Sequence, residues 1–213
     1  MDAVVFDLDG VLVDSETTWD EVRRAFAARH GGTWRDDSTR AVQGMSTPEW
    51  AAYLVEAVGV RLPPAEVAAG VVGEMARRYD AGPPVLPGAV AAVRAIAAHR
   101  PVAIASSSPP VLITSFLTAT GLAPLVPVAV SSEEAGAGKP APDVYLRAAE
   151  LLGVTPSRCA AVEDSTNGLR AALAAGMTVY AVPNPHFPPD PAVLARATAL
   201  RSVAELPAAL GLA

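Results

Sequence analysis

The chain has 213 residues, 51% of them hydrophobic, which is enough for one core domain and a smaller lobe. Its 16 basic and 22 acidic residues give a net charge of −6 without a basic tract, so we expect no nucleic-acid partner, because phosphate-backbone binding needs clustered Lys and Arg. No stretch reaches the roughly 20 apolar residues of a membrane span and no signal-peptide core is present, so a cytoplasmic protein with no membrane partner is expected.

The first predicted element is a strand over residues 3–6, followed by Asp7 and Asp9 and then by Gly10. Side chains two residues apart in a strand leave the same face, so both carboxylates are expected to point into one small volume. Two acids held so close repel each other unless a cation lies between them or they share a proton. The pair is a candidate for metal-assisted chemistry, in which one carboxylate attacks and the other transfers a proton. The alternative is a strand end whose aspartates cap the following turn.

Residues 15–84 carry helical periodicity and no β-type run. Apolar residues recur at helical spacing in three stretches, around 19–26, 50–57 and 64–79. The segment ends in Ala-Gly-Pro-Pro at 81–84, which is a stiff, turn-rich joint. We therefore predict a helical domain over 15–84, inserted into a discontinuous core domain over 1–14 and 85–213. An insertion that begins beside Asp7 and Asp9 is placed to cover them.

The rest of the chain alternates between short apolar runs and helical patterns. Further strands are predicted over 102–105, 126–130, 159–162 and 178–182, and helices over 88–99, 109–120, 142–152 and 165–175. This alternation indicates βαβ units, so we predict an α/β fold with a Rossmann-like parallel sheet covered on both faces. Sheets of this kind bind ligands at the carboxyl ends of their strands. Cys159, the only cysteine, excludes an intrachain disulfide and is expected in the core.

Polar residues follow two of these later strands. The second strand ends in Ser106, Ser107 and Ser108, whose hydroxyl and N–H groups suit an anion. The same run is also an ordinary helix start, with Ser108 as the N-cap. The fourth strand ends in Glu163 and Asp164, a second acidic pair. Paired carboxylates favour an oxygen-liganded hard cation such as Mg²⁺ over zinc, which prefers His and Cys.

Lys139 is the only lysine among the 16 basic residues. In a chain so biased towards arginine, a retained lysine indicates a position that needs a compact, flexible ammonium rather than a planar guanidinium. It lies in the proline-rich loop 138–143 after the third strand, and is therefore expected at the same edge of the sheet. The alternative is a solvated surface lysine.

In order and type, these motifs resemble those of the haloacid dehalogenase-like hydrolases, above all the group with a helical cap that includes β-phosphoglucomutase and sugar-phosphate phosphatases. The matching segments are 6–10, 14–16, 105–108, 138–143 and 162–168. The resemblance implies that Asp7 is the nucleophile that becomes an aspartyl phosphate. It also implies that Asp9 protonates the leaving oxygen and then activates water.

The resemblance further implies how phosphate and metal are bound. Ser106, Ser107 and Lys139 would hold the phosphoryl oxygens. Mg²⁺ would be bound by the Asp7 carboxylate, the Asp9 backbone carbonyl and Asp164, with Glu163 either a ligand or a neighbour of the ligands.

The cap departs from the pattern of the mutases. Where those proteins carry a His and an Arg, this chain has Trp19 and Thr47, which disfavours a phosphomutase, because a mutase must reorient a bisphosphate. Trp19 is either a wall on which a sugar or carbon chain stacks or a core residue between cap helices. Gln43, Gly44 and Met45 form the cap loop and are further candidates for specificity, with Gln43 a donor to substrate hydroxyls and Met45 more typical of the core.

The resemblance thus implies a Mg²⁺-dependent phosphatase that hydrolyses a small phosphomonoester, with a sugar or polyol phosphate as the expected substrate. The alternatives are a phosphomutase and, from a different class, a regulatory relative that does no chemistry. The intact set of acids argues against the regulatory relative. The expected partner is a small phosphorylated metabolite, and the expected state is a monomer or weak dimer.

Overall fold

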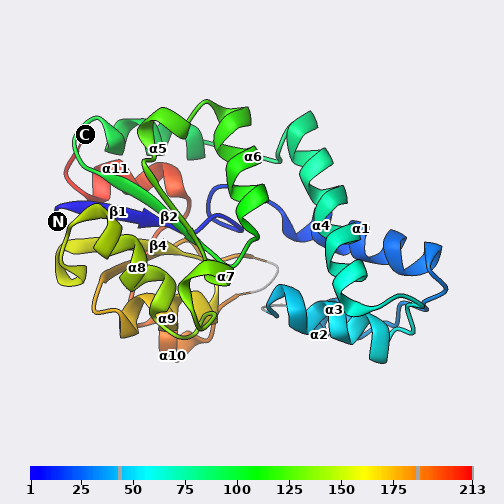
Figure 1. Cartoon of the computed structure of the whole chain (residues 1–213). Coiled ribbons are helices and arrows are strands. Elements are labelled where there is room, and N and C mark those ends of the chain that lie inside the picture. The colour runs from blue at the N-terminus through cyan, green and yellow to red at the C-terminus, as the bar shows by residue number, and fades with distance from the viewer. Residues whose placement is uncertain (43–44, 186–187, 213) are drawn as a thin grey trace.

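The computed structural model describes residues 1–42, 45–185 and 188–212 (Figure 1). Their strands form one parallel sheet of six strands in the order β3-β2-β1-β4-β5-β6, which confirms the predicted α/β fold. In chain order the strands are β1 (Ala3–Phe6), β2 (Val102–Ser106), β3 (Val128–Ser131), β4 (Cys159–Glu163), β5 (Thr178–Ala181) and β6 (Thr198–Ala199).

Helices cover both faces of the sheet, as the continuous apolar strands predict. In β1, Val4 and Phe6 face a core shared with α5 (Ala89–Ala97) and α6 (Pro110–Thr120). Ala3 and Val5 face the opposite core, shared with α8 (Asp143–Leu152) and α9 (Thr166–Ala174). Three short helices complete this part: α7 (Ser132–Ala135), α10 (Pro191–Leu194) and α11 (Leu206–Ala209).

In its described residues, the predicted helical segment contains four helices, one more than the three predicted stretches, and they lie to one side of the sheet (Figure 1). They are α1 (Glu16–Arg29), α2 (Ser38–Ala41), α3 (Thr47–Glu56) and α4 (Pro64–Ala81). Helix α4 packs against α1 and α3 and also against α6 of the sheet region. At Gly70 a Cβ atom would lie 2.3 Å from the Phe26 ring, so only glycine allows α1 to approach α4 this closely. The division of the chain into two domains stays a prediction.

Differences from the predicted elements are small. Strand β3 begins at Val128, two residues after the predicted start, which is within the usual uncertainty of element ends. Strand β6 was not predicted, because two exposed residues carry no apolar pattern. Cys159 is fully buried, as expected. Among the described residues, no helix combines the length and the apolar character needed to cross a bilayer.

Candidate active site

The parallel register brings the chemically distinctive residues to one edge of the sheet. Phe6, the last residue of β1, pairs with Ile104 of β2 on one side and with Val162 of β4 on the other. Residues that follow these strands therefore leave the sheet at nearly the same level. The Asp7 amide donates to the Val162 carbonyl over 2.9 Å, which fixes the first of them.

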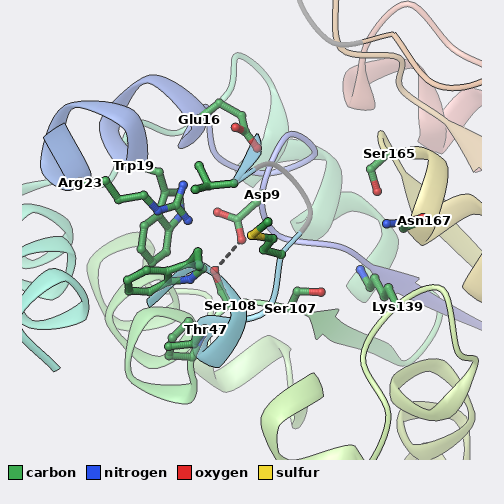
Figure 2. A pocket seen from close by; sticks show the side chains of 14 residues that line it. Asp9, Glu16, Trp19, Arg23, Thr47, Ser107, Ser108, Lys139, Ser165 and Asn167 are labelled. Carbon is green, nitrogen blue, oxygen red and sulfur yellow. Dashed lines mark hydrogen bonds between the residues drawn. The ribbon is translucent and has the colours of Figure 1, made fainter. Parts of the chain in front are cut away.

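A pocket of about 120 Å³ lies between this edge and the helical segment (Figure 2). From the sheet side it is lined by Asp9, Ser107 and Lys139. From the helical segment it is lined by Trp19 and Arg23 of α1 and by Met45, which precedes α3. Trp19 lines the pocket and also belongs to the hydrophobic core, so its core packing is confirmed and its contact with a substrate stays a prediction. Met45 is half-buried and lines the pocket as well. Two further cap candidates, Gln43 and Gly44, lie outside the described residues.

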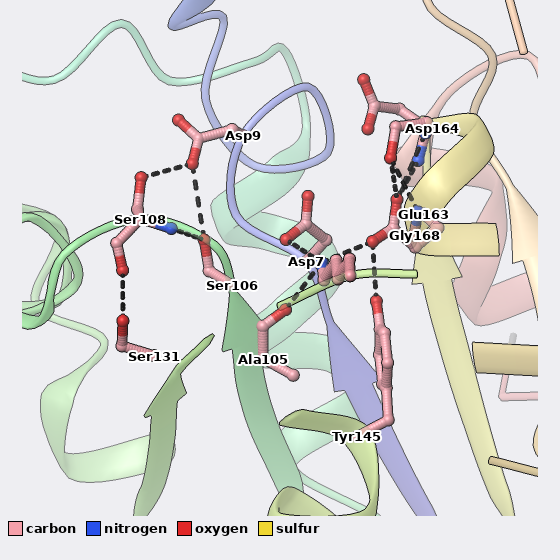
Figure 3. A network of polar contacts seen from close by, with 12 residues as sticks. Asp7, Asp9, Ala105, Ser106, Ser108, Ser131, Tyr145, Glu163, Asp164 and Gly168 are labelled. Atoms are coloured by element: carbon pink, nitrogen blue, oxygen red, sulfur yellow. Dashed lines mark hydrogen bonds and ion pairs between the residues drawn. The ribbon is translucent and has the colours of Figure 1, made fainter. Parts of the chain in front are cut away.

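A polar network at the strand ends includes Asp7, Ala105 and Glu163 (Figure 3), and Lys139 bonds to all three. Its Nζ donates to Asp7 Oδ1 over 2.7 Å, to Glu163 Oε1 over 2.5 Å and to the Ala105 carbonyl over 3.2 Å. With its side chain only 6% exposed, Lys139 is not a solvated surface lysine. Burial disfavours the ammonium, yet Asp7 and Glu163 together keep the pKa of Lys139 above its ordinary value.

Asp7 and Asp164 are buried close to other acidic side chains. Burial raises the pKa of Asp7 to about 8; Lys139 opposes this shift, while Glu163 and Asp9 add to it. Burial, together with Glu163 and Asp7, also places the pKa of Asp164 well above its ordinary range. The ammonium of Lys139 alone therefore does not balance the acids, and the site favours additional positive charge.

Glu163 is held on all sides. Its Oε1 accepts hydrogen bonds from Lys139 and from the Tyr145 hydroxyl, the latter over 2.8 Å. Its Oε2 accepts from the amide of Asp164 at 3.1 Å and from the amide and hydroxyl of Ser165 at 3.2 and 3.1 Å. A carboxylate has about four acceptor sites, so these five bonds use its whole capacity. Glu163 fixes the direction of Lys139.

Two glycines make room for the acids. A Cβ atom at Gly168 would lie 1.8 Å from Glu163 Oε1. At Gly10, where φ is +76°, a Cβ atom would lie 2.0 Å from Asp164 Oδ2. Any side chain at either position would therefore displace a carboxylate.

Asp9 is bound by different partners from Asp7. Its carboxylate accepts hydrogen bonds from the hydroxyls of Ser15, of Ser108 at 2.6 Å and of Ser106 at 3.4 Å. The expectation that both acids point into one small volume assumed a continuous strand. Because β1 ends at Phe6, the alternation of a strand does not extend to Asp9, and Figure 3 shows the two carboxylates in separate networks.

The three serines after β2 differ in exposure and contacts. Ser106 is fully buried and accepts from the Ser108 amide over 3.0 Å. Ser107 is exposed and lines the pocket. The assignment of Ser108 as a helix cap is wrong: Pro109 is the N-cap of α6, and the Ser108 hydroxyl goes to Asp9, a partner that lies 99 residues away.

Carboxylate oxygens of Asp7, Glu163 and Asp164 lie within 4.8 Å of one another, close enough to surround one cation. Two other residues at the site, Arg23 and Tyr145, were not predicted to take part, and neither was the bond from the Ser108 hydroxyl to Asp9. Arg23 lies one helical turn after Trp19 and therefore on the same face of α1, a signal that the sequence contained.

Comparison with known proteins shows which family the chain belongs to. A match to the haloacid dehalogenase-like hydrolase family covers residues 1–176, so the chain belongs to that family. Hexitol phosphatase B of Escherichia coli (strain K12) is 34% identical over 97% of this chain and 94% of its own length. A bifunctional riboflavin kinase/FMN phosphatase of Arabidopsis thaliana is 32% identical over 85% of this chain, which spans about half (48%) of that protein. The crystal structure of CbbY from Rhodobacter sphaeroides in complex with phosphate superposes with a TM-score of 0.86 at 25% identity, covering 97% of this chain and 96% of that one.

Proposed function

We propose that this chain is a Mg²⁺-dependent phosphatase that hydrolyses a small phosphomonoester, a sugar or polyol phosphate, through an aspartyl phosphate on Asp7. The observation that carries the proposal is the buried network in which Lys139 joins Asp7 to Glu163 at the carboxyl edge of the sheet. The name of the similar hexitol phosphatase supports the substrate class, and the phosphate complex of CbbY supports an anion site on this fold.

The donor set fits Mg²⁺. Clustered carboxylate oxygens are hard ligands of the kind that Mg²⁺ prefers, and no thiol lies among them. Because every acceptor site of Glu163 is used, we assign the ion to the carboxylates of Asp7 and Asp164 and the backbone carbonyl of Asp9. When bound, the ion supplies positive charge that neutralises the transferring phosphoryl group.

Asp7 and Asp9 divide the covalent chemistry. A carboxylate oxygen of Asp7 attacks phosphorus, the bond from phosphorus to the substrate oxygen breaks, and Asp9 gives its proton to the leaving alkoxide. In the second half Asp9 takes a proton from water, and the resulting hydroxide attacks phosphorus and releases Asp7 and inorganic phosphate. The hydroxyls of Ser15 and Ser108 hold the Asp9 carboxylate in a fixed direction for both transfers.

Lys139, Ser106 and Ser107 hold the phosphoryl oxygens in this proposal. Lys139 lines the pocket and also bonds to Asp7, so its positive charge stabilises the phosphoryl group during its transfer to Asp7. The exposed hydroxyl of Ser107 lines the same pocket. The Ser106 hydroxyl reaches Asp9 only over 3.4 Å, a long bond that can be exchanged for a phosphoryl oxygen.

The helical segment acts as a cap over the site, with Trp19 and Met45 as walls against the substrate. The pocket of about 120 Å³ is small compared with the roughly 300–1,000 Å³ of sites for drug-sized ligands, which favours a small metabolite.

The direct test is phosphate release by the purified protein from p-nitrophenyl phosphate and from glucitol 6-phosphate. We expect release with Mg²⁺, loss of release after EDTA treatment, and recovery when Mg²⁺ is restored. Release that EDTA does not affect would refute the metal assignment. No release from any phosphomonoester in a metabolite panel would refute the phosphatase.

A further inference from the structure

Arg23 is a buried cation in the pocket wall. The residue is 9% exposed, and its Nε atom has no hydrogen-bond partner among the described residues. Glu16, Asp9 and Asp20 act on its charge from a distance, but none of them bonds to the guanidinium. A buried, unpaired charge is costly, and native proteins keep one where something else compensates for it.

Two indole rings hold the guanidinium in place. Its central carbon lies 4.6 Å from the centroid of the Trp19 ring and 5.1 Å from that of Trp50. Such contacts stabilise a cation by about 0.5–2 kcal/mol, but they engage the guanidinium through ring faces. The N–H donors lie in the guanidinium plane, so the indole contacts leave them available to an acceptor.

Thr47 supplies a second, independent observation. Its Oγ1 is buried without a hydrogen-bond partner among the described residues, and Thr47 lines the same pocket. Figure 2 shows Arg23 and Thr47 on the helical side of the pocket, Lys139 on the far side and Asp9 between them. A substrate with its phosphate at Lys139 therefore extends its other end towards Arg23.

The charges around Arg23 indicate which group it binds. Burial lowers the pKa of Arg23 to about 10, while Glu16, Asp9 and Asp20 limit the decrease, so the guanidinium is charged at neutral pH. A neutral hydroxyl would leave that charge uncompensated. A second phosphate would bring two negative charges towards Asp9 and Glu16. A carboxylate carries one charge and fits the guanidinium fork with two parallel hydrogen bonds.

We propose that Arg23, assisted by the Thr47 hydroxyl, binds a carboxylate at the end of the substrate remote from the phosphate. Among the proposed small phosphomonoesters, phosphorylated sugar acids are then the preferred substrates, and Arg23 is the residue that favours them over the matching alcohols, which are hydrolysed more slowly. This inference rests on the proposed phosphatase function and names its substrate class.

Two matched substrate pairs test it: 3-phospho-D-glycerate against sn-glycerol 1-phosphate, and 6-phospho-D-gluconate against D-glucitol 6-phosphate. The members of each pair differ only in a carboxylate against a primary alcohol. For the wild type with Mg²⁺ we expect kcat/KM to favour the acid by about tenfold or more in at least one pair, the scale of a charged hydrogen bond. Arg23→Met should bring that ratio close to one, and Arg23→Lys should keep part of it.

Arg24→Met is the matched control. Arg24 is the next residue on α1, but it is exposed and pairs with Asp20 over 2.6 Å, so its removal should leave the acid-to-alcohol ratio as in the wild type. If thermal unfolding shows that Arg23→Met does not fold, the acid-to-alcohol ratio of kcat/KM is measured in Arg23→Lys and Thr47→Val instead, and both should lower it.

The outcomes separate the two proposals. Phosphate release without preference for either acid, or a preference that survives in Arg23→Met, overturns the role of Arg23 and leaves the phosphatase intact. A higher kcat/KM for glucitol 1,6-bisphosphate than for 6-phosphogluconate overturns the carboxylate assignment. No release from any compound overturns the phosphatase and this inference with it.

Discussion

Lys139 and Arg23 are both buried cations that line one pocket, but their surroundings differ. Lys139 donates to two carboxylates and a carbonyl, whereas the Nε of Arg23 finds no acceptor in the described part of the chain and the guanidinium lies against two indole rings. A fully bonded network is rigid before any substrate arrives, which suits groups that must meet a transition state. The unsatisfied Nε donor of Arg23, in contrast, gains an acceptor only when a ligand binds.

This difference follows from how each region is built. The sheet edge is assembled by backbone pairing, which fixes the ends of β1, β2 and β4 relative to one another. The helical wall is formed by side chains of α1 and α3, neither of which belongs to the sheet. We infer that the sheet edge determines the reaction and that the helical wall determines the substrate.

The largest expected effect is at the attacking carboxylate. Asp7→Asn should lower kcat by about a thousandfold or more, because removal of a group that forms the covalent intermediate leaves only binding and electrostatic contributions. Steady-state phosphate release from p-nitrophenyl phosphate measures it. Turnover within tenfold of the wild type would show that Asp7 is not the nucleophile.

Replacement of each buried cation by methionine should change the free energy of unfolding by different amounts. Lys139→Met leaves Asp7 and Glu163 without their shared partner, and we expect a loss of about 3–5 kcal/mol in the free energy of unfolding. Arg23→Met loses the two indole contacts but also removes a buried charge whose Nε has no hydrogen-bond partner among the described residues, so it should change stability by less than about 1 kcal/mol or increase it.

Urea unfolding in EDTA and without phosphate compares the two variants, since neither metal nor ligand then contributes. Equal losses in both variants would contradict the difference between a satisfied and an unsatisfied cation.

A glycine pair tests how tightly Glu163 is held. Gly168→Ala places a Cβ atom 1.8 Å from Glu163 Oε1, and displacement of the carboxylate should cost about 1–3 kcal/mol and lower kcat. Gly73→Ala is the control, because this helical glycine of α4 has only the Arg77 side chain nearby, at 3.9 Å, and should gain up to about 1 kcal/mol. Thermal unfolding and kcat of both variants measure these effects. If Gly168→Ala changes neither stability nor kcat, Glu163 is free to move.

The smallest expected effect is at Tyr145. Tyr145→Phe removes one donor to Glu163 Oε1, which keeps its bond to Lys139, so we expect about 1 kcal/mol of lost stability and a fall in kcat of less than tenfold. Urea unfolding and steady-state kinetics measure the two effects. A loss as large as that of Lys139→Met would place Tyr145, rather than Lys139, at the centre of the network.

Residues at the sheet edge were predictable, because parallel strands end at one level and Lys139 is the only lysine of the chain. The orientation of Asp9 was not, because the strand pattern stops at Phe6. Ser108 was assigned to a helix start since a local pattern cannot show a partner 99 residues away. Arg23 was overlooked because it follows Trp19 among the charged residues of α1, and only the fold shows that it is buried.

The most direct test of the central claim, that Asp7 takes the phosphoryl group, uses Asp9→Asn. Without its proton-transfer group the enzyme should still be phosphorylated slowly but should not hydrolyse the intermediate. After incubation with p-nitrophenyl phosphate and Mg²⁺, mass spectrometry of the intact protein should show one added phosphoryl group, and peptide mapping should place it on Asp7. Unmodified protein, or a phosphoryl group on any other residue, would contradict the account.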